Sequence, residues 1–211
     1  NQAETIAEAT TGTVNFAHTD GITDTALKLA DVNGDVTDEL DAATAPGGDA
    51  DTAITVTTVA NVAQAQTISG ESTGEIDFSA GIKDVAAAMS DASGGITTPF
   101  NNATQDDTDA QIIVEDVVNV EQAKTIAEAS SGAIDFRLGI EDAAGDLANI
   151  GGTIDASLTA ATAVTGDSDT TIKITTSANV AQASTIAQST TGQVDFDAGI
   201  EDDIGNMSNA G

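Results

Sequence analysis

Residues Thr5–Phe16 read Thr-Ile-Ala-Glu-Ala-Thr-Thr-Gly-Thr-Val-Asn-Phe, and this stretch organises the rest of the chain. Related stretches recur at Thr67–Phe78, Thr125–Phe136 and Thr185–Phe196, with successive starts 62, 58 and 60 residues apart. Tandem copies of one unit are typical of proteins in which each copy buries part of its apolar face against the next. The sequence therefore predicts tandem repeats packed as a solenoid or as a linear array.

The repeat divides the chain into four copies. The first covers residues 1–66, the second 67–124, the third 125–184, and a partial fourth 185–211. Gln2 matches Gln64, so the first copy begins inside the unit, and the fourth copy breaks off inside it. We expect the unit to continue on at least one side, in a longer chain or in a neighbouring subunit.

The first half of each unit predicts a strand, a helix and a second strand. Residues 54–57 alternate β-branched apolar and polar side chains, as a half-buried strand does. Val62, Ala65 and Ile68 then share a helical face, and Asn61 stands at the N-cap position before it. The helix ends by Gly74, and residues 75–78 form a short strand whose phenylalanine fills the core.

The second half predicts another helix and a third strand. Residues 81–89 place apolar side chains on one helical side, and a Gly-Gly turn leads to Ile96 and Phe100 at alternating spacing. The order strand, helix, strand, helix, strand assigns the chain to the α/β class, with some parallel pairing.

The net charge of the chain limits the kinds of partner that it can bind. The chain has 5 Lys plus Arg against 35 Asp plus Glu, a formal net charge of −30. Such a surface repels nucleic acid and anionic membranes, so we expect neither as a partner, and it suits cations. No apolar run is long enough to insert into a membrane. There is no cysteine, so packing between copies or bound Ca²⁺ would have to stabilise thin cores of small side chains.

Acidic loops precede the alternating strand in three copies. Alternate carboxylates and intervening carbonyls in such a loop can surround one Ca²⁺, which takes six to eight oxygens, whereas the alternative is that they are ordinary turn residues. Aspartates of the short strand could join the same site. The candidate ligands are Asp49, Asp51, Asp106, Asp107, Asp109, Asp167 and Asp169 in the loops, and Asp77, Asp135 and Asp195 in the strands.

Two further acidic motifs have simpler interpretations. A recurring acid, as at Asp84 and Asp142, lies where the short helix is expected to start, and capping of helix N–H groups explains it. Residues 31–35 resemble the start of an EF-hand calcium-binding loop. However, Val36 and Ala42 occupy the positions at which that loop requires Gly and Glu. We interpret that stretch as a turn.

Catalytic residues are scarce, and we expect no enzyme. The single histidine, His18, lies in an insertion found in one copy only. No cysteine nucleophile and no Gly-rich phosphate loop is present in the sequence. Sugar sites usually employ aromatic platforms, and the chain has no Trp or Tyr.

The motif Ala-Asn-Val-Ala-Gln-Ala-x-Thr-Ile, at Ala60–Ile68 and Ala178–Ile186, lies between a Val/Ile-Thr strand and Gly-x-Ile/Val-Asp-Phe. In this it resembles repeats of very large acidic surface proteins of marine bacteria and cyanobacteria, in the company of type I-secreted, calcium-rich adhesins. The third copy departs from the motif at residues 117–122. The Gly-Gly-x-Gly-x-Asp nonapeptide of calcium β-rolls is absent from the sequence, so no metal ligand is carried over. The resemblance implies an extracellular, structural role.

Together these features predict a non-enzymatic repeat region of an extracellular filament, surface layer or adhesin stalk. Calcium would stabilise it, and its partners would be adjacent repeats or other copies of itself. A ligand- or glycan-binding surface module is the alternative, and one copy with a distinctive concave polar cluster would favour it.

Overall fold

The computed structural model describes residues 2–10, 13–16, 21–45, 48–163 and 166–203. These residues form a mixed α/β fold of ten helices and nine short strands, which confirms the predicted class. In chain order the elements are α1 (Gln2–Ala9), β1 (Ile22–Asp24), α2 (Ala26–Leu29), α3 (Asp38–Thr44), β2 (Ile54–Val56), α4 (Val62–Glu71), β3 (Ile76–Asp77), β4 (Ile82–Asp84), α5 (Ala86–Met89), α6 (Thr98–Asp106), β5 (Ile112–Val114), α7 (Val120–Ala129), β6 (Ile134–Phe136), β7 (Ile140–Asp142), α8 (Ala144–Leu147), α9 (Ala156–Ala161), β8 (Ile172–Ile174), α10 (Val180–Gln188) and β9 (Val194–Phe196).

The chain separates into two compact units. The first unit comprises Asn1–Asp84 and Thr97–Ile112, and the second comprises Val85–Ile96 and Ile113–Gly211. Strand β5 begins at the last residue of the first unit.

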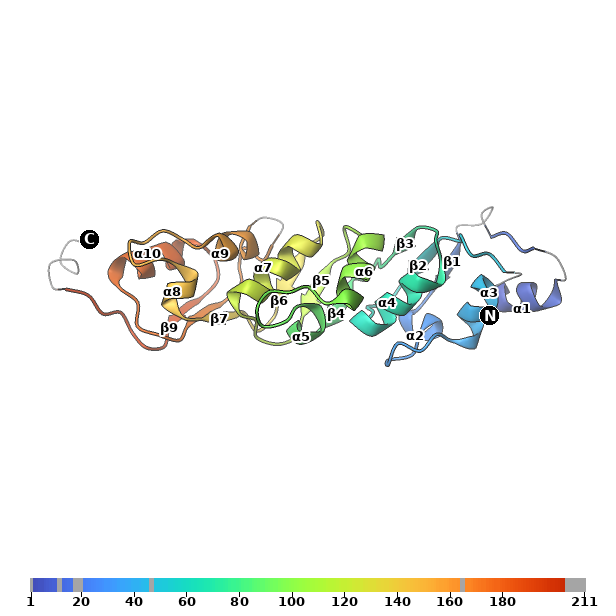
Figure 1. The fold of residues 1–211 in the computed structure, drawn as a ribbon, viewed down its shortest axis with the longest axis horizontal. Helices are drawn as coiled ribbons and strands as arrows, with labels where there is room; N and C mark the ends of the chain where they lie inside the picture. Colours follow the sequence, from blue (N-terminus) through green and yellow to red (C-terminus); the bar gives the residue numbers. More distant parts are fainter. Residues whose placement is uncertain (1, 11–12, 17–20, 46–47, 164–165, 204–211) are drawn as a thin grey trace. The chain divides into compact units, whose positions relative to one another are not determined.

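The first unit contains a parallel sheet in the order β1-β2-β3 (Figure 1). Ile22, Ile54 and Ile76 stand in one register across the three strands, and all three are buried. Helices α2 and α3 lie between β1 and β2 in sequence, and α4 lies between β2 and β3. Because parallel strands require such crossovers, the predicted strand–helix–strand order and parallel pairing are confirmed here.

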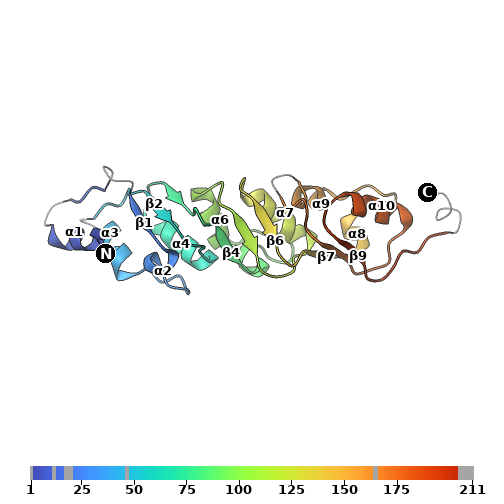
Figure 2. The ribbon, with the colours of Figure 1, turned by 180° about the vertical axis from the view of Figure 1, so that it is seen from behind.

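The second unit contains a sheet of the same kind, in the order β7-β8-β9, and Figure 2 shows it beside α8, α9 and α10. Ile140, Ile172 and Val194 share one register. Ile140 and Ile172 are almost fully buried, together with Leu147 of α8 and Ile126 of α7. The core is therefore a layer of branched aliphatic side chains between short strands and helices.

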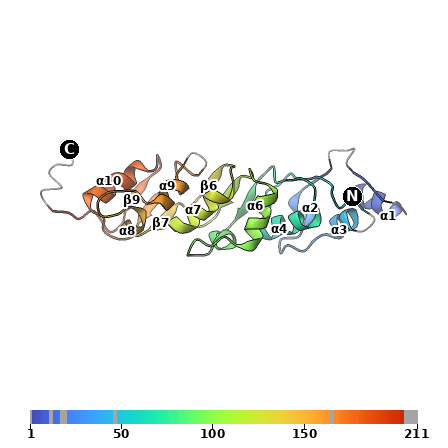
Figure 3. The same ribbon diagram turned by 45° about the horizontal axis from the view of Figure 1, so that its top comes forward.

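Within each unit, a long helix packs against the helix that follows later in the chain. Helix α1 contacts α3 and α4 contacts α6 in the first unit, and α7 contacts α9 in the second. Figure 3 shows α4 and α6 side by side. Ile68 of α4 and Phe100 of α6 have no exposed surface, so this contact is part of the core.

The predicted start of the long helices is confirmed. The Asn61 side chain accepts a hydrogen bond from Gln64 N–H, and the Gln64 side chain accepts one from Asn61 N–H. The same reciprocal capping box is formed at Asn119 and at Asn179. Asn followed three residues later by Gln is thus the sequence signal for these helices.

The second half of the unit differs from the sequence prediction. Residues 81–89 form the strand β4 and then the four-residue helix α5, so the expected single helix was wrong. The expected third strand was wrong too, because Phe100 lies inside helix α6. Thr97 caps that helix and a proline occupies its first turn, which are helix-start signals that outweigh the alternating spacing.

The recurrent phenylalanines are core residues in three of the four copies. Phe16, Phe78 and Phe136 are 8%, 2% and 2% exposed. Phe196 differs from the prediction because it is only half-buried.

Candidate functional site

One aspartate of each acidic loop is buried and accepts a backbone hydrogen bond. The Phe78 N–H donates to Asp107 Oδ2 at 2.6 Å, and the Phe136 N–H donates to Asp167 Oδ2 at 2.8 Å. Asp49 accepts from the amide of Phe16 in the same way. These three aspartates are 4–8% exposed. Each one ties its loop to the strand residue that fills the core.

In two of these loops a second carboxylate lies beside the buried one, and both burial and this neighbour disfavour the charged form of the buried group. Burial is the main cause that raises the pKa of Asp167, to about 6, and the neighbouring Asp169 and the charge of Asp135 raise it further. The Phe136 N–H opposes this rise. Burial, and then Asp109, raise the pKa of Asp107 in the same manner.

The first copy contains a pair of the same kind. There the side chain and charge of Asp49 raise the pKa of the exposed Asp51. In all three loops, then, two carboxylates two residues apart are held close together, and a proton or a cation between them would relieve their repulsion.

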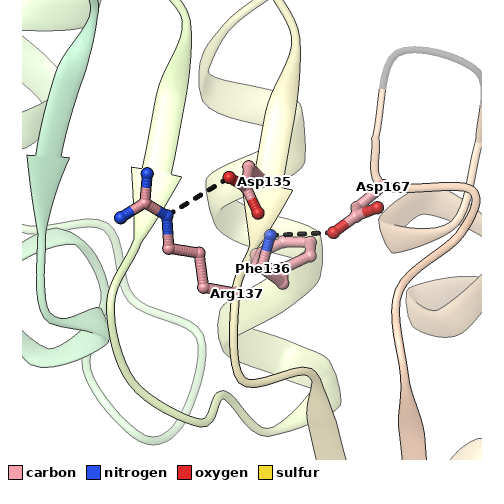
Figure 4. Close-up of polar contacts among 4 residues, drawn as sticks. All are labelled: Asp135, Phe136, Arg137 and Asp167. Atoms are coloured by element: carbon pink, nitrogen blue, oxygen red, sulfur yellow. Dashed lines mark hydrogen bonds and ion pairs between the residues drawn. The ribbon is translucent and has the colours of Figure 1, made fainter.

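The strand aspartates do not extend these pairs into a larger cluster. Asp135 turns toward Arg137, whose Nε lies 3.3 Å from Asp135 Oδ2, while Asp167 approaches the Phe136 amide (Figure 4). Asp77 and Asp195 are exposed on their strands. Across the described part of the chain, no three His, Asp or Glu side chains converge as a metal-holding group.

Asp106 is the predicted ligand that lies farthest from its expected role. It is the last residue of α6, and it lines a pocket between that helix and α4 while its neighbour Asp107 faces the phenylalanine amide. The sequence placed both residues in one loop, whereas Asp106 ends helix α6 and Asp107 is the C-cap residue of that helix.

The recurring acids at residues 84, 142 and 202 cap a different helix from the expected one. Each of them lies 22 residues after the first residue of a long helix and accepts a hydrogen bond from the N–H of that residue. Asp84 Oδ2 accepts from Val62 N–H, and Asp142 Oδ2 from Val120 N–H, both at 3.1 Å. Capping was the correct role, but strand β4 or β7 carries the acid back to α4 or α7.

Amide and hydroxyl groups of the long helices also bond to carbonyls about thirty residues earlier. Gln64 Nε2 donates to Ala30 O at 2.9 Å, and Asn61 Nδ2 donates to Val32 O at 2.9 Å. The second unit repeats these bonds from Gln182 to Ala148 and from Asn179 to Ile150. The sequence predicts the asparagine caps but not these hydrogen bonds to distant carbonyls. They join residues about thirty positions apart, which a local motif does not contain.

A polar pocket of about 270 Å³ opens between α4 and α6 in the first unit. Its lining residues are Gln66, Ser69, Gly70, Asn102, Gln105 and Asp106. Sequence analysis missed it, although comparison of matched positions among the copies would have revealed these polar side chains.

His18, the residue on which a histidine-dependent mechanism would rest, lies outside the described residues.

Comparison with known proteins gives no family assignment. No family model matches the chain, and neither the curated proteins nor the solved structures include a match. Within the described ranges, no helix has both the length and the apolar character required to cross a bilayer.

Proposed function

We propose that this chain is a non-enzymatic structural region of an extracellular filament, surface layer or adhesin stalk that associates end to end with copies of itself. The observation that carries the proposal is the buried aspartate that accepts the phenylalanine N–H in three successive copies of the repeat. The same hydrogen bond recurs at matched positions in three copies although the loop sequences differ. Such repetition favours a structural role over a single active site.

The long helices support the same interpretation. Their caps, their bridging amides and their acid-capped first N–H groups recur at matched positions in the two units. These contacts involve backbone groups on one side, so they hold elements together and leave few side chains for chemistry. An extracellular location rests on the sequence resemblance and on the acidity.

Calcium has a defined role in this proposal. The paired carboxylates Asp107 with Asp109, and Asp167 with Asp169, would share one Ca²⁺ each, and loop carbonyls and water would complete its oxygen shell. Binding would replace carboxylate repulsion with attraction and stiffen the loop that holds the phenylalanine. Asp49 and Asp51 would form a third such site.

Sedimentation of the whole chain, in EGTA and then in millimolar Ca²⁺, tests the proposal. We expect the weight-average mass to rise with protein concentration and to rise more steeply with Ca²⁺. A triple Asp51→Asn, Asp109→Asn, Asp169→Asn variant, which alters all three pairs, should keep the association seen in EGTA but lose the calcium increment. Glu128→Gln, an exposed acid on α7, is the matched control. A chain that stays monomeric at high concentration in both buffers would contradict self-association.

A further inference from the structure

We propose that two copies of this chain associate by parallel pairing of two open strand edges. One edge is residues 200–202 of the second unit, and the other is strand β1 of the first unit in the next copy. This inference rests on the self-association proposed above, and it names the surfaces and the register by which that association occurs.

A covered position inside the second unit shows what these edges lack. Ile140 N–H donates to Thr171 O at 2.8 Å on one side. On the other side Ile140 forms a parallel bridge with Val118, and Glu141 N–H donates to Val118 O at 2.9 Å. Ile140 therefore has backbone neighbours at both edges, and its side chain is 1% exposed.

Ile200 occupies the position that matches Ile140, but only one of its edges is covered. It forms a parallel bridge with Ala178, and Glu201 N–H donates to Ala178 O at 2.9 Å. Successive N–H groups of a strand point to opposite edges, so the N–H of Ile200 faces away from Ala178. No strand of the described residues pairs on that side, and Ile200 is 44% exposed. An apolar side chain and an unpaired edge thus lie together.

Strand β1 supplies the second open edge. It is the outer strand in the order β1-β2-β3, and residues 21–23 match residues 139–141 in the repeat. In the second unit the matching edge is occupied, because Val118 N–H donates to Gly139 O at 3.2 Å and Glu141 N–H donates to Val118 O. Among the described residues nothing holds the place of Val118 beside β1. Such edges are surfaces to which another strand can be added.

The free backbone groups of the two edges are complementary. Ile22 N–H donates to Ala53 O, so the C=O of Gly21 and the N–H of Thr23 face the outer side of β1. Ile200 of another copy would donate its N–H to Gly21 O and accept from Thr23 N–H. These are the two bonds that Val118 forms in the second unit, and they place Ile200 opposite Ile22.

This contact joins two different surfaces, so it does not close on itself in a pair. Each copy that binds through residues 200–202 still presents its own β1 edge, and a contact of this kind produces open chains of copies. Glu201 and Asp202 at one edge and Asp24 at the other are acidic, and their repulsion opposes the contact. Dissolved salt should therefore promote association by screening these charges.

The register predicts a variant that associates more strongly. Glu141 stands opposite Lys173 in the paired strands β7 and β8, with 3.3 Å between Lys173 Nζ and Glu141 Oε1. Glu201 matches Glu141, and in the proposed register it faces Thr23 of the next copy. Thr23→Lys should recreate the ion pair and strengthen association by about two- to fivefold. Thr98→Lys makes the same charge change at an exposed threonine outside both edges and is the matched control.

Disulfide cross-linking tests the register directly, because the chain has no cysteine of its own. Paired strands lie about 4.8 Å apart, within the range of about 4.4–6.8 Å that a disulfide spans between Cα atoms. A mixture of the Thr23→Cys and Glu201→Cys variants should form linked dimers under mild oxidation, much faster than either variant alone. A mixture of Thr23→Cys with Glu128→Cys, an exposed acid on α7, is the control.

Sedimentation of two lysine variants tests the apolar part of the contact. Ile200→Lys should weaken association at least about tenfold, because it removes an isoleucine that the contact buries. Ile150→Lys changes an 83% exposed isoleucine in a turn of the same unit and should not weaken association. Association that persists equally in both variants, or cross-linking no faster than in the control mixture, would overturn this contact and leave self-association standing. An unchanged chain that remains monomeric would overturn both proposals.

Discussion

Asp167 illustrates how one buried carboxyl links stability to pH. Its pKa is about 6 in the folded chain, against 3.8 for the ordinary group, because burial and then Asp169 disfavour the charged form. Below about pH 4 the group is protonated in both states and imposes no penalty. As pH rises from about 4 to about 6, the unfolded chain ionises first, so the contribution of Asp167 to folding stability falls, and it stays lost above that range.

Replacement of Asp167 by Asn should therefore stabilise the protein at neutral pH. The amide oxygen can still accept from Phe136 N–H, and the repulsion from Asp169 and Asp135 is removed. We expect a gain on the order of 2 kcal/mol in the free energy of unfolding at pH 7 without divalent cations, which disappears toward pH 4. Urea unfolding at several pH values measures it. An exposed acid, Glu128→Gln, serves as control, and a gain that is independent of pH would contradict the assignment.

The sequence singled out these aspartates as cation ligands, which stays a prediction, but it did not foresee their hydrogen bonds to phenylalanine amides. Recurrence before a strand singled out Asp49, Asp107 and Asp167, and their turn chemistry suggested a cation. Their hydrogen bond to a phenylalanine amide depends on burial and on a contact across about thirty residues, neither of which a local pattern contains. Ser69 is a similar case, since the lack of a hydrogen-bond partner for its Oγ among the described residues depends on the folded surroundings.

The long helices depend on a side chain with two functions. Asn119 caps α7 through its oxygen, which accepts from Gln122 N–H at 2.8 Å, and its Nδ2 donates to Ala92 O at 2.9 Å. Asn119→Ala removes both bonds and should lower the free energy of unfolding by about 1–3 kcal/mol. Asn119→Asp keeps the capping acceptor and loses only the donor, so its loss should be smaller. Urea unfolding compares the two, and equal losses would show that the cap contributes nothing.

Two glycines in the first unit should respond in opposite directions to alanine. Gly70 lies in helix α4 with open space around it, so Gly70→Ala should stabilise the chain by about 0.5–1 kcal/mol. Gly81 has φ +85° and a Cβ there would lie 2.6 Å from Gln111 O, so Gly81→Ala should destabilise it by more than about 1 kcal/mol. Thermal unfolding of both variants tests this contrast. A loss in Gly70→Ala would mean that α4 is more tightly packed than described.

Gly81 also explains why sequence patterning failed in the second half of the unit. Ile82, Ala86 and Met89 are spaced as on one helix, and all are buried. Yet the positive φ of Gly81 starts a strand, and Ile82 N–H donates to Gln111 O at 2.8 Å before the chain turns into α5. A strand followed by one helical turn produces the same spacing as a continuous helix. Longer elements with caps, such as α4, carry enough signal to be predicted, whereas elements of three or four residues do not.

Net charge dominates the behaviour of the molecule as a whole. With a formal net charge of −30, charge repulsion disfavours the compact state, and dissolved salt screens it over a Debye length of about 10 Å at 0.1 M. Sodium chloride should thus raise the melting temperature gradually, without a saturation point in the millimolar range. This rise needs no specific site, so any calcium effect has to be judged against it.

Calcium and sodium chloride compared at equal ionic strength separate screening from binding. If the carboxylate pairs Asp107–Asp109 and Asp167–Asp169 hold Ca²⁺, the melting temperature should rise further in calcium and saturate as the sites fill. Magnesium should raise it less, because it demands a tighter octahedral shell than a loop pair supplies. In the triple variant Asp51→Asn, Asp109→Asn, Asp169→Asn the calcium increment should vanish while the sodium response persists. Equal melting-temperature curves in sodium and calcium for the unchanged chain would contradict calcium binding by these loops. The stability of the protein would then rest on packing among its helices and strands.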